Sequence, residues 1–264
     1  MWALVKKTWA DSRKPIGWWV FGLIVLCAVQ LSVYPSIRES AASLKKFLDL
    51  YPDALKKIFR MQDYTTGPGY LSTELFSLVL PLIVISVGAS FGARASAQEE
   101  EDGTADILLT LPMSRNRILL SKILANQVVL VGLGVVIFAM LAVGGPMVDL
   151  QINTLKLLSG VVSCVLIGVA FGALATMAGG LSGRKGLSLG VATGLAVTFY
   201  VLFSLAGLVE SFKHVLPMNP FQWTIGDSPL FNGFDWPGIA KLVVFSGVCF
   251  AVSFWSFNRR DIRA

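Results

Sequence analysis

Long apolar stretches alternate with short polar segments along the whole chain. Six stretches of 19 to 26 residues each carry at most one charged residue, and they cover about residues 16–34, 69–93, 118–143, 157–180, 187–209 and 238–257. A helix of that length crosses a hydrocarbon core of about 30 Å with some tilt. The pattern therefore predicts a single domain, residues 1–264, with six transmembrane helices.

Composition supports the same class. Hydrophobic residues make up 55% of the chain and charged residues only 14%, with a mean hydropathy of +0.69. A soluble domain usually carries about 25% charged residues. A disordered chain has a lower hydrophobic fraction and a higher charge than this sequence. We therefore expect an all-α integral membrane protein. The first stretch is too long for a typical signal-peptide core and lacks a small-x-small cleavage site after it, so we expect it to stay as an anchor.

The distribution of positive charge predicts the orientation. Six spans put both termini on one side, and with the termini inside, 13 Lys and Arg residues lie inside and 9 outside. The positive-inside rule then favours cytoplasmic N- and C-termini in a cell membrane. One loop, Arg38–Arg60, speaks against this orientation, because it holds six of the nine outer charges.

Two outer loops carry apolar side chains of their own. The first has roughly helical spacing at Leu44, Phe47 and Leu48, with lysines between, and it predicts one or two amphipathic helices on the outer membrane surface. The last, around Pro220 and Trp223, predicts a compact aromatic-rich cap. Each loop is read first as a structural connector, and as an alternative as a lid or flap that contacts a substrate.

Few polar residues interrupt the spans. Glu74 is the only acid inside one, near its outer end, and Lys122 lies close enough to a helix end to snorkel. Asn126 and Gln127 form the main polar pair. Buried amides usually hydrogen-bond between helices, and a place on a substrate path is the alternative.

Glycine recurs at every fourth position in three of the spans, which gives each helix a smooth stripe where another backbone can approach closely. Such stripes favour helix packing, and they also permit neighbouring helices to slide or rock. The residues concerned are Gly88 and Gly92, Gly168 and Gly172, and Gly186, Gly190 and Gly194. Pro81 is expected to kink the second span.

No residue set for catalysis, metal binding or phosphate binding is present in the sequence. His214 is the only histidine, the three cysteines lie in apolar stretches, and no phosphate-binding Gly-x-x-x-x-Gly-Lys-Ser/Thr motif occurs. We therefore expect no bound cofactor, no metal and no catalytic site in this chain. The net charge of +6 fits contact with anionic lipid better than with nucleic acid.

The segment between the second and third spans, residues 94–117, holds the most informative pattern. Four consecutive acids, Glu99–Asp102, precede Gly103. Thr104 can cap a short helix that runs to about Leu111, with an acid in its favourable first turn.

Proline and serine mark the end of this short helix. Pro112 ends it, and Ser114 can cap the third span. Ile107, Leu108 and Leu111 give the helix an apolar side. Because a solitary helix of two turns is marginal in water, it must pack either on the membrane base of its own chain or on a soluble partner.

The order of residues in this segment resembles that of a known family. The matching residues are Glu-Glu-x-x-Gly-Thr at Glu99–Thr104, Leu108-Leu109, Leu111-Pro112, Ser114-Arg115, Lys122 and, in the preceding span, Tyr70–Phe76. They resemble the permeases of type-two ABC exporters, the ABC-2 family.

The resemblance implies a coupling helix seated in a cleft of a separate ATPase subunit, and an amphipathic connecting helix over residues 1–15. It also implies two ATPase copies, which bind ATP and Mg, and a second permease that is identical or related. The implied coupling residues are Glu99, Glu100, Glu101, Gly103, Thr104, Ile107, Leu108, Leu111, Pro112, Ser114 and Arg115. The acidic run is longer than the two acids expected, which leaves open which glutamate matters.

An exporter of hydrophobic or amphipathic molecules, such as a drug, antibiotic, peptide or lipid, is the leading hypothesis. Similar permeases also serve ion extrusion or the maturation of metal enzymes. A non-transporting membrane scaffold or sensor that recruits a soluble partner is the alternative, and a membrane-embedded enzyme is poorly supported because no catalytic set is present.

Overall fold

The computed structural model describes residues 12–43, 63–103 and 114–259, and within these ranges every regular element is a helix. Six helices are long and apolar enough to cross a membrane: α2 (Arg13–Glu39), the run α5–η1–α6 (Gly67–Glu101), α8 (Arg115–Met147), α9 (Thr154–Ser182), α10 (Lys185–Leu205) and α13 (Trp236–Arg259). The predicted all-α class with six spans is confirmed. The predicted coupling helix and the amphipathic helices of the first outer loop lie outside the described residues, as does the connecting helix predicted over residues 1–15 up to residue 11; residues 13–15 belong to α2.

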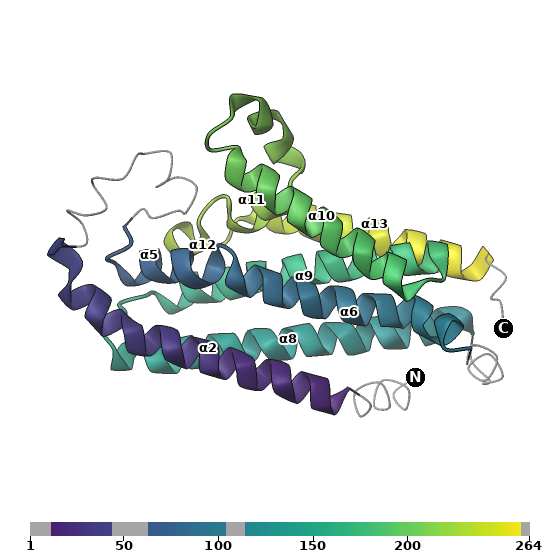
Figure 1. The fold of residues 1–264 in the computed structure, drawn as a ribbon, viewed down its shortest axis with the longest axis horizontal. Coiled ribbons are helices and arrows are strands. Elements are labelled where there is room, and N and C mark those ends of the chain that lie inside the picture. The colour runs from purple at the N-terminus through teal and green to yellow at the C-terminus, as the bar shows by residue number, and fades with distance from the viewer. Residues whose placement is uncertain (1–11, 44–62, 104–113, 260–264) are drawn as a thin grey trace.

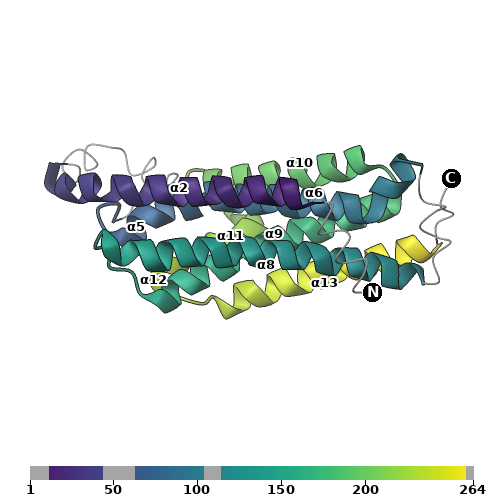
Figure 2. The same cartoon turned by 90° about the horizontal axis from the view of Figure 1, so that it is seen from below.

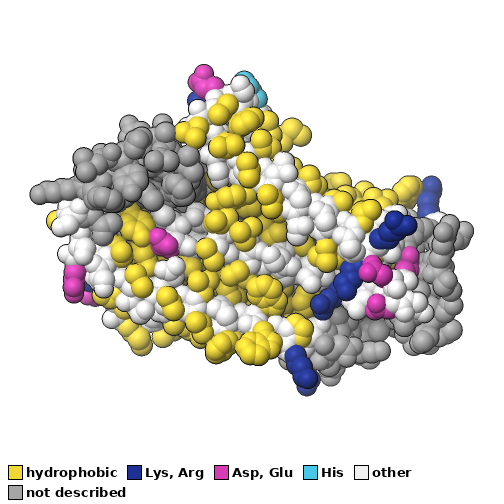
Figure 3. Space-filling view, in the orientation of Figure 1, with side chains coloured by type: hydrophobic (Ala, Val, Ile, Leu, Met, Phe, Trp, Pro, Cys, Tyr) yellow, Lys and Arg dark blue, Asp and Glu magenta, His cyan; other side chains and the backbone are white. Residues whose placement is uncertain are grey.

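Successive long helices run in opposite directions and lie side by side in one elongated bundle (Figures 1 and 2). Residues from the end of α6, the start of α8 and the start of α10 meet at one end, which we call the charged end and define by Glu99–Gly103, Ser114–Lys122 and Arg184–Lys185. The start of α2 and the end of α13 lie at the same end. Figure 3 shows Lys and Arg around several acids there, and a broad hydrophobic surface over the middle of the bundle.

Helix α9 forms the centre of the bundle. In the most apolar 18-residue stretch of α9, 72% of the residues are buried, against 17% in the corresponding stretches of α2 and α10. It packs most extensively on α6, and α13, α10 and α8 surround it. The remaining apolar side chains of α2 and α10 face outward, as expected for helices that meet lipid.

The second span is not one continuous α-helix. A π-helical turn, η1 (Ser72–Phe76), follows the short α5 (Gly67–Leu71), and Leu78 leaves helical geometry at φ −141° and ψ −55° before α6 (Val79–Glu101) begins. The prolyl ring of Pro81 would clash with the carbonyl four residues earlier in a continuous helix. The interruption therefore falls just before Pro81, which lies in the first turn of α6, where its missing N–H costs little.

A set of polar contacts lies at the end of the bundle opposite the charged end, which we call the far end. The Tyr70 hydroxyl donates to Gln30 Oε1 at 2.5 Å, and the Tyr64 hydroxyl donates to Glu74 Oε1 at 2.7 Å. The only acid inside a predicted span is thus hydrogen-bonded close to the bundle surface. Arg38 of α2 pairs with Asp149, beyond α8, at 2.9 Å.

The segment after α10 has a packed part and a projecting part. Helix α10 ends at Leu205, four residues before the predicted end of its span, shortly before Gly207, which disfavours a helix. The 3-10 helix η2 (Glu210–Met218) projects from the bundle, and none of its residues is buried by the described ranges. Helices α11 (Pro220–Ile225) and α12 (Pro229–Asn232) pack on α9, and Phe221 is buried among aromatic rings that include Phe171 and Tyr200.

Candidate functional site: the charged end

An ion pair joins the two helices that flank residues 104–113. The carboxylate of Glu99, in the last turn of α6, contacts the ammonium group of Lys122, which lies two turns into α8. Lys122 is only 9% exposed, and the side chain of Glu99 is 28% exposed. The sequence allows Lys122 to snorkel to a helix end. In the structure its side chain is buried, and Glu99 supplies the counter-charge that a buried ammonium group requires.

A second glutamate, Glu101, joins the end of α6 to the start of α10. The Lys185 backbone N–H, at the start of α10, donates to Glu101 Oε2 at 2.7 Å, across 84 residues of sequence. The N-cap residue of α10 is Arg184, whose own side chain forms no capping hydrogen bond in the described structure. Glu101 therefore satisfies one of the free N–H groups of α10 and places a negative charge at the positive end of its helix dipole.

Gly103 and Ser114 mark the two edges of the undescribed segment. Gly103 has φ +65°, and its N–H donates to Glu100 O at 3.3 Å, so the chain turns away from α6 in a conformation that glycine adopts most readily. Ser114 has the extended backbone of an N-cap, as predicted, but within the described ranges its hydroxyl makes no capping hydrogen bond. Arg115 is the first residue of α8.

Most of the predicted coupling helix lies outside the described residues. The residues outside the described ranges are Thr104, Ile107, Leu108, Leu111 and Pro112. The described members of the predicted set, Glu99, Glu100, Glu101, Gly103, Ser114 and Arg115, lie at the charged end, while the contact of the segment with a partner stays a prediction.

The glycine stripes fall into two groups. Gly88 and Gly92 of α6 face Gly168 and Gly172 of α9: a Cβ added to Gly88 would lie 2.2 Å from Gly168 O, and one added to Gly92 would lie 2.2 Å from Gly172 O. Only glycine allows this approach of the two backbones.

The third stripe lies on an outer face. An added Cβ at Gly186, Gly190 or Gly194 of α10 would meet nothing within 4 Å in the described part of the chain. Within this chain these three glycines therefore make no packing contact of the predicted kind, and their role in packing stays a prediction.

Comparison with known proteins decides the family. A family described as "ABC-2 family transporter protein" matches residues 2–262. This chain is an ABC-2 transporter permease. It is also 32% identical over 249 residues to a protein named "Probable ABC transporter permease protein NosY" from Pseudomonas aeruginosa, covering 89% of this chain and 82% of that protein.

Family membership confirms several expectations. ABC-2 permeases are multi-pass membrane proteins that lack an ATPase domain and pair with ATPase subunits. The permease is therefore a transport subunit rather than an enzyme, as the sequence predicted. In the ranges that the structure describes, no three His, Cys, Asp or Glu side chains lie close enough to hold a metal ion.

The partners of the two key glutamates are what sequence reasoning missed in the permease. Lys122 belongs to the residues that carry the family resemblance but not to the predicted site, and Lys185 enters the sequence analysis only through its positive charge. A signal for Lys122 did exist, since a lone lysine two turns inside an apolar helix needs a counter-charge, and the acids lie on the same side of the membrane.

The amide pair in the permease divides in two. Asn126 is 1% exposed, and its Nδ2 donates to Gly88 O at 3.3 Å, an interhelical hydrogen bond from α8 to α6. Gln127 is half-buried, and its Nε2 is buried without a hydrogen-bond partner among the described residues. The place of either residue on a substrate path stays a prediction.

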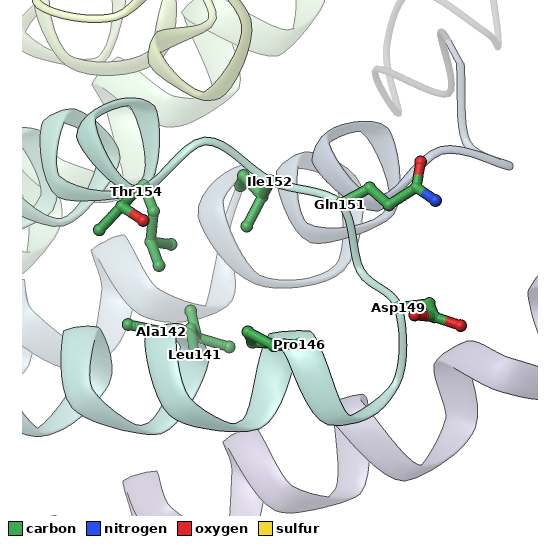
Figure 4. Close-up of a pocket in the computed structure, with 9 residues that line it drawn as sticks. Leu141, Ala142, Pro146, Asp149, Gln151, Ile152 and Thr154 are labelled. Atoms are coloured by element: carbon green, nitrogen blue, oxygen red, sulfur yellow. The ribbon is translucent and has the colours of Figure 1, made fainter.

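A cavity of about 260 Å³ opens at the far end of the permease, between α8 and α9 (Figure 4). Leu141, Pro146 and Ile152 line the cavity together with Asp149 and Gln151, whose side chains point outward in Figure 4. The cavity is smaller than the usual range of ligand pockets, about 300–1,000 Å³, and contains no predicted site residue. The charged end is therefore the better candidate site.

Proposed function

We propose that this permease exports a hydrophobic or amphipathic molecule, such as a drug, antibiotic, peptide or lipid, driven by ATP hydrolysis on two copies of a separate ATPase subunit. A second permease, identical or related, completes the pathway. ATP and Mg bind to the ATPase, not to this chain. The match to the ABC-2 family over residues 2–262 is the observation that carries the proposal.

The charged end supports the predicted site of coupling. The end of α6 and the start of α8 frame residues 104–113 at the same end of the bundle as the start of α2 and the end of α13. In the proposed orientation this end is cytoplasmic, where an ATPase has access to the segment. The positive-inside count of the sequence supports the same orientation.

The interior of the bundle supports an uncharged or amphipathic cargo. The far-end acid Glu74 is hydrogen-bonded to Tyr64, and the buried cation Lys122 is paired at the charged end. Amides and hydroxyls are the main polar groups between them, including Asn126, Ser163 and Thr176. Between these two groups, the buried residues that the structure describes include no charge at mid-membrane of the kind by which ion-coupled carriers bind their ions.

Affinity purification in mild detergent, followed by identification of the bound chains, tests the assembly. We expect an ABC ATPase to co-purify, and we expect proteoliposomes of the complex to accumulate a fluorescent lipid or hydrophobic dye when ATP is added. A complex with a substitution of the ATPase's phosphate-loop lysine is the matched control and should not transport. Recovery of a soluble partner without ATPase activity would support the scaffold alternative instead.

A further inference from the structure

The acidic run before residues 104–113 is engaged within the chain itself. Glu99 contacts Lys122 of α8, and Glu101 accepts the first backbone N–H of α10. The two contacts join one short stretch at the end of α6 to two different helices, α8 and α10. The family resemblance implies that both acids belong to the coupling residues, and it leaves open which glutamate matters.

The first contact is the more buried of the two. Lys122 lies among buried residues of α8, including Leu119 and Ile123, where an ammonium group without a counter-charge is strongly unfavourable. Its charge is neutralised by Glu99, whose Oε1 contacts the ammonium group. The pair connects the end of α6, which precedes residues 104–113, to α8, which follows them.

The second contact reaches a helix that has few buried residues. Only 17% of the most apolar window of α10 is buried, and the start of α10 has no cap from Arg184 in the described structure. Glu101 is exposed, and its carboxylate accepts a charge-assisted hydrogen bond from the Lys185 N–H. This bond joins the start of α10 to the end of α6.

We propose that Glu99 and Glu101 are positioning residues that fasten the coupling segment to α8 and α10, rather than residues that contact the ATPase. This inference rests on the proposed function. When the ATPase displaces residues 104–113, the Glu99–Lys122 pair moves the start of α8 with the end of α6, and the Glu101 cap moves the start of α10 with them. The acids thereby convert a local displacement into a movement of three helices.

A double-mutant cycle in the purified permease–ATPase complex tests the first contact. We expect Glu99→Gln and Lys122→Met each to lower ATP-dependent transport by about tenfold, and the double variant to be no worse than the more impaired single variant. The amount of ATPase that co-purifies should stay within about twofold of wild type in all three. Asp102→Asn, at an exposed acid in the same run, is the matched control and should keep transport within about twofold.

Two results would overturn the first contact. One is multiplication of the two single effects in the double variant, and the other is loss of the ATPase from Glu99→Gln alone, which a direct contact predicts. If either single variant fails to assemble, Lys122→Arg and Glu99→Asp keep both charges. These conservative variants should then recover most of the transport, and failure to do so while they fold would contradict the ion pair.

Hydrogen exchange in the permease alone tests the second contact and does not depend on the ATPase. Glu101→Ala should speed exchange of the Lys185 amide by about tenfold, since it removes the acceptor, whereas Asp102→Ala should leave it unchanged. Unchanged exchange in Glu101→Ala would refute the cap even if transport falls. Failure of any ATPase to co-purify would refute the proposed function while leaving this result intact.

Discussion

Two glycine stripes with the same spacing have opposite fates in this permease. Gly88 and Gly92 of α6 lie against backbone atoms of α9, whereas Gly190 and its neighbours on α10 face outward. Helix α10 instead turns Ser188, Ala192 and Ala196 toward the bundle. A spacing of four therefore indicates a smooth helix face, but it does not say whether that face meets protein or lipid.

The reason lies in the solvent. In water, the apolar face of a helix must be the buried one, and periodicity gives its direction. In a bilayer the lipid tails are as apolar as leucine, so no such force separates the two faces. Contact between α6 and α9 instead depends on matched small residues in both helices, and α10 finds its match through alanine and serine.

The largest expected effect is that of Gly88→Val. Its side chain would collide with the backbone oxygen of Gly168, which cannot move aside as a flexible side chain could. We expect a loss of about 3 kcal/mol or more of folding free energy, at the upper end of overpacking effects. Fluorescence-detected size-exclusion after a temperature ramp would measure it. A melting temperature equal to that of wild type would show that α6 and α9 do not approach as described.

Ala192→Leu tests the buried side of α10 and should have the next largest effect. Ala192 is fully buried against Ala89 and Ala175, so three added carbons must displace one of three packed helices. We expect about 2 kcal/mol of destabilisation. The same thermal assay reads it, with Ala192→Ser as the control of nearly equal size. Equal stability of the two variants would indicate that this side of α10 is not packed.

Gly190→Leu, on the opposite side of α10, should have the smallest effect. An added side chain there meets open space in the described structure, and leucine favours a helix more than glycine does. We expect a change within about 0.5 kcal/mol for the isolated permease. A melting temperature as low as that of Ala192→Leu would mean that α10 is rotated relative to the described bundle.

Much of the fold follows from hydropathy, because a helix that crosses lipid must satisfy its backbone internally and carry apolar side chains throughout. The six spans were therefore predictable. The π-helical turn at Ser72–Phe76 was not, because hydropathy does not distinguish a π-helical turn from an α-helical one. Pro81 gave the region of the break but not its position.

The candidate site was predictable in part for a related reason. A run of four acids before Gly103 stands out against an apolar chain, so the segment could be found. Its contacts could not, because Glu101 reaches a helix 84 residues away and periodicity carries no information about such pairs. The contacts with Lys122 and with the Lys185 N–H are the observations on which the proposal of internal positioning rests.

One backbone atom joins three helices: Gly88 O lies at the crossing of α6 with α9 and also accepts the hydrogen bond from Asn126 of α8. If α6 shifted by one helical turn, about 5.4 Å, along α9, one of the two glycine pairs would be replaced by a residue with a side chain, and the bond to Asn126 would break. Axial translation is thus blocked in both directions. The crossing consequently keeps α6, α8 and α9 in register, so a displacement of α6 would carry the other two helices with it.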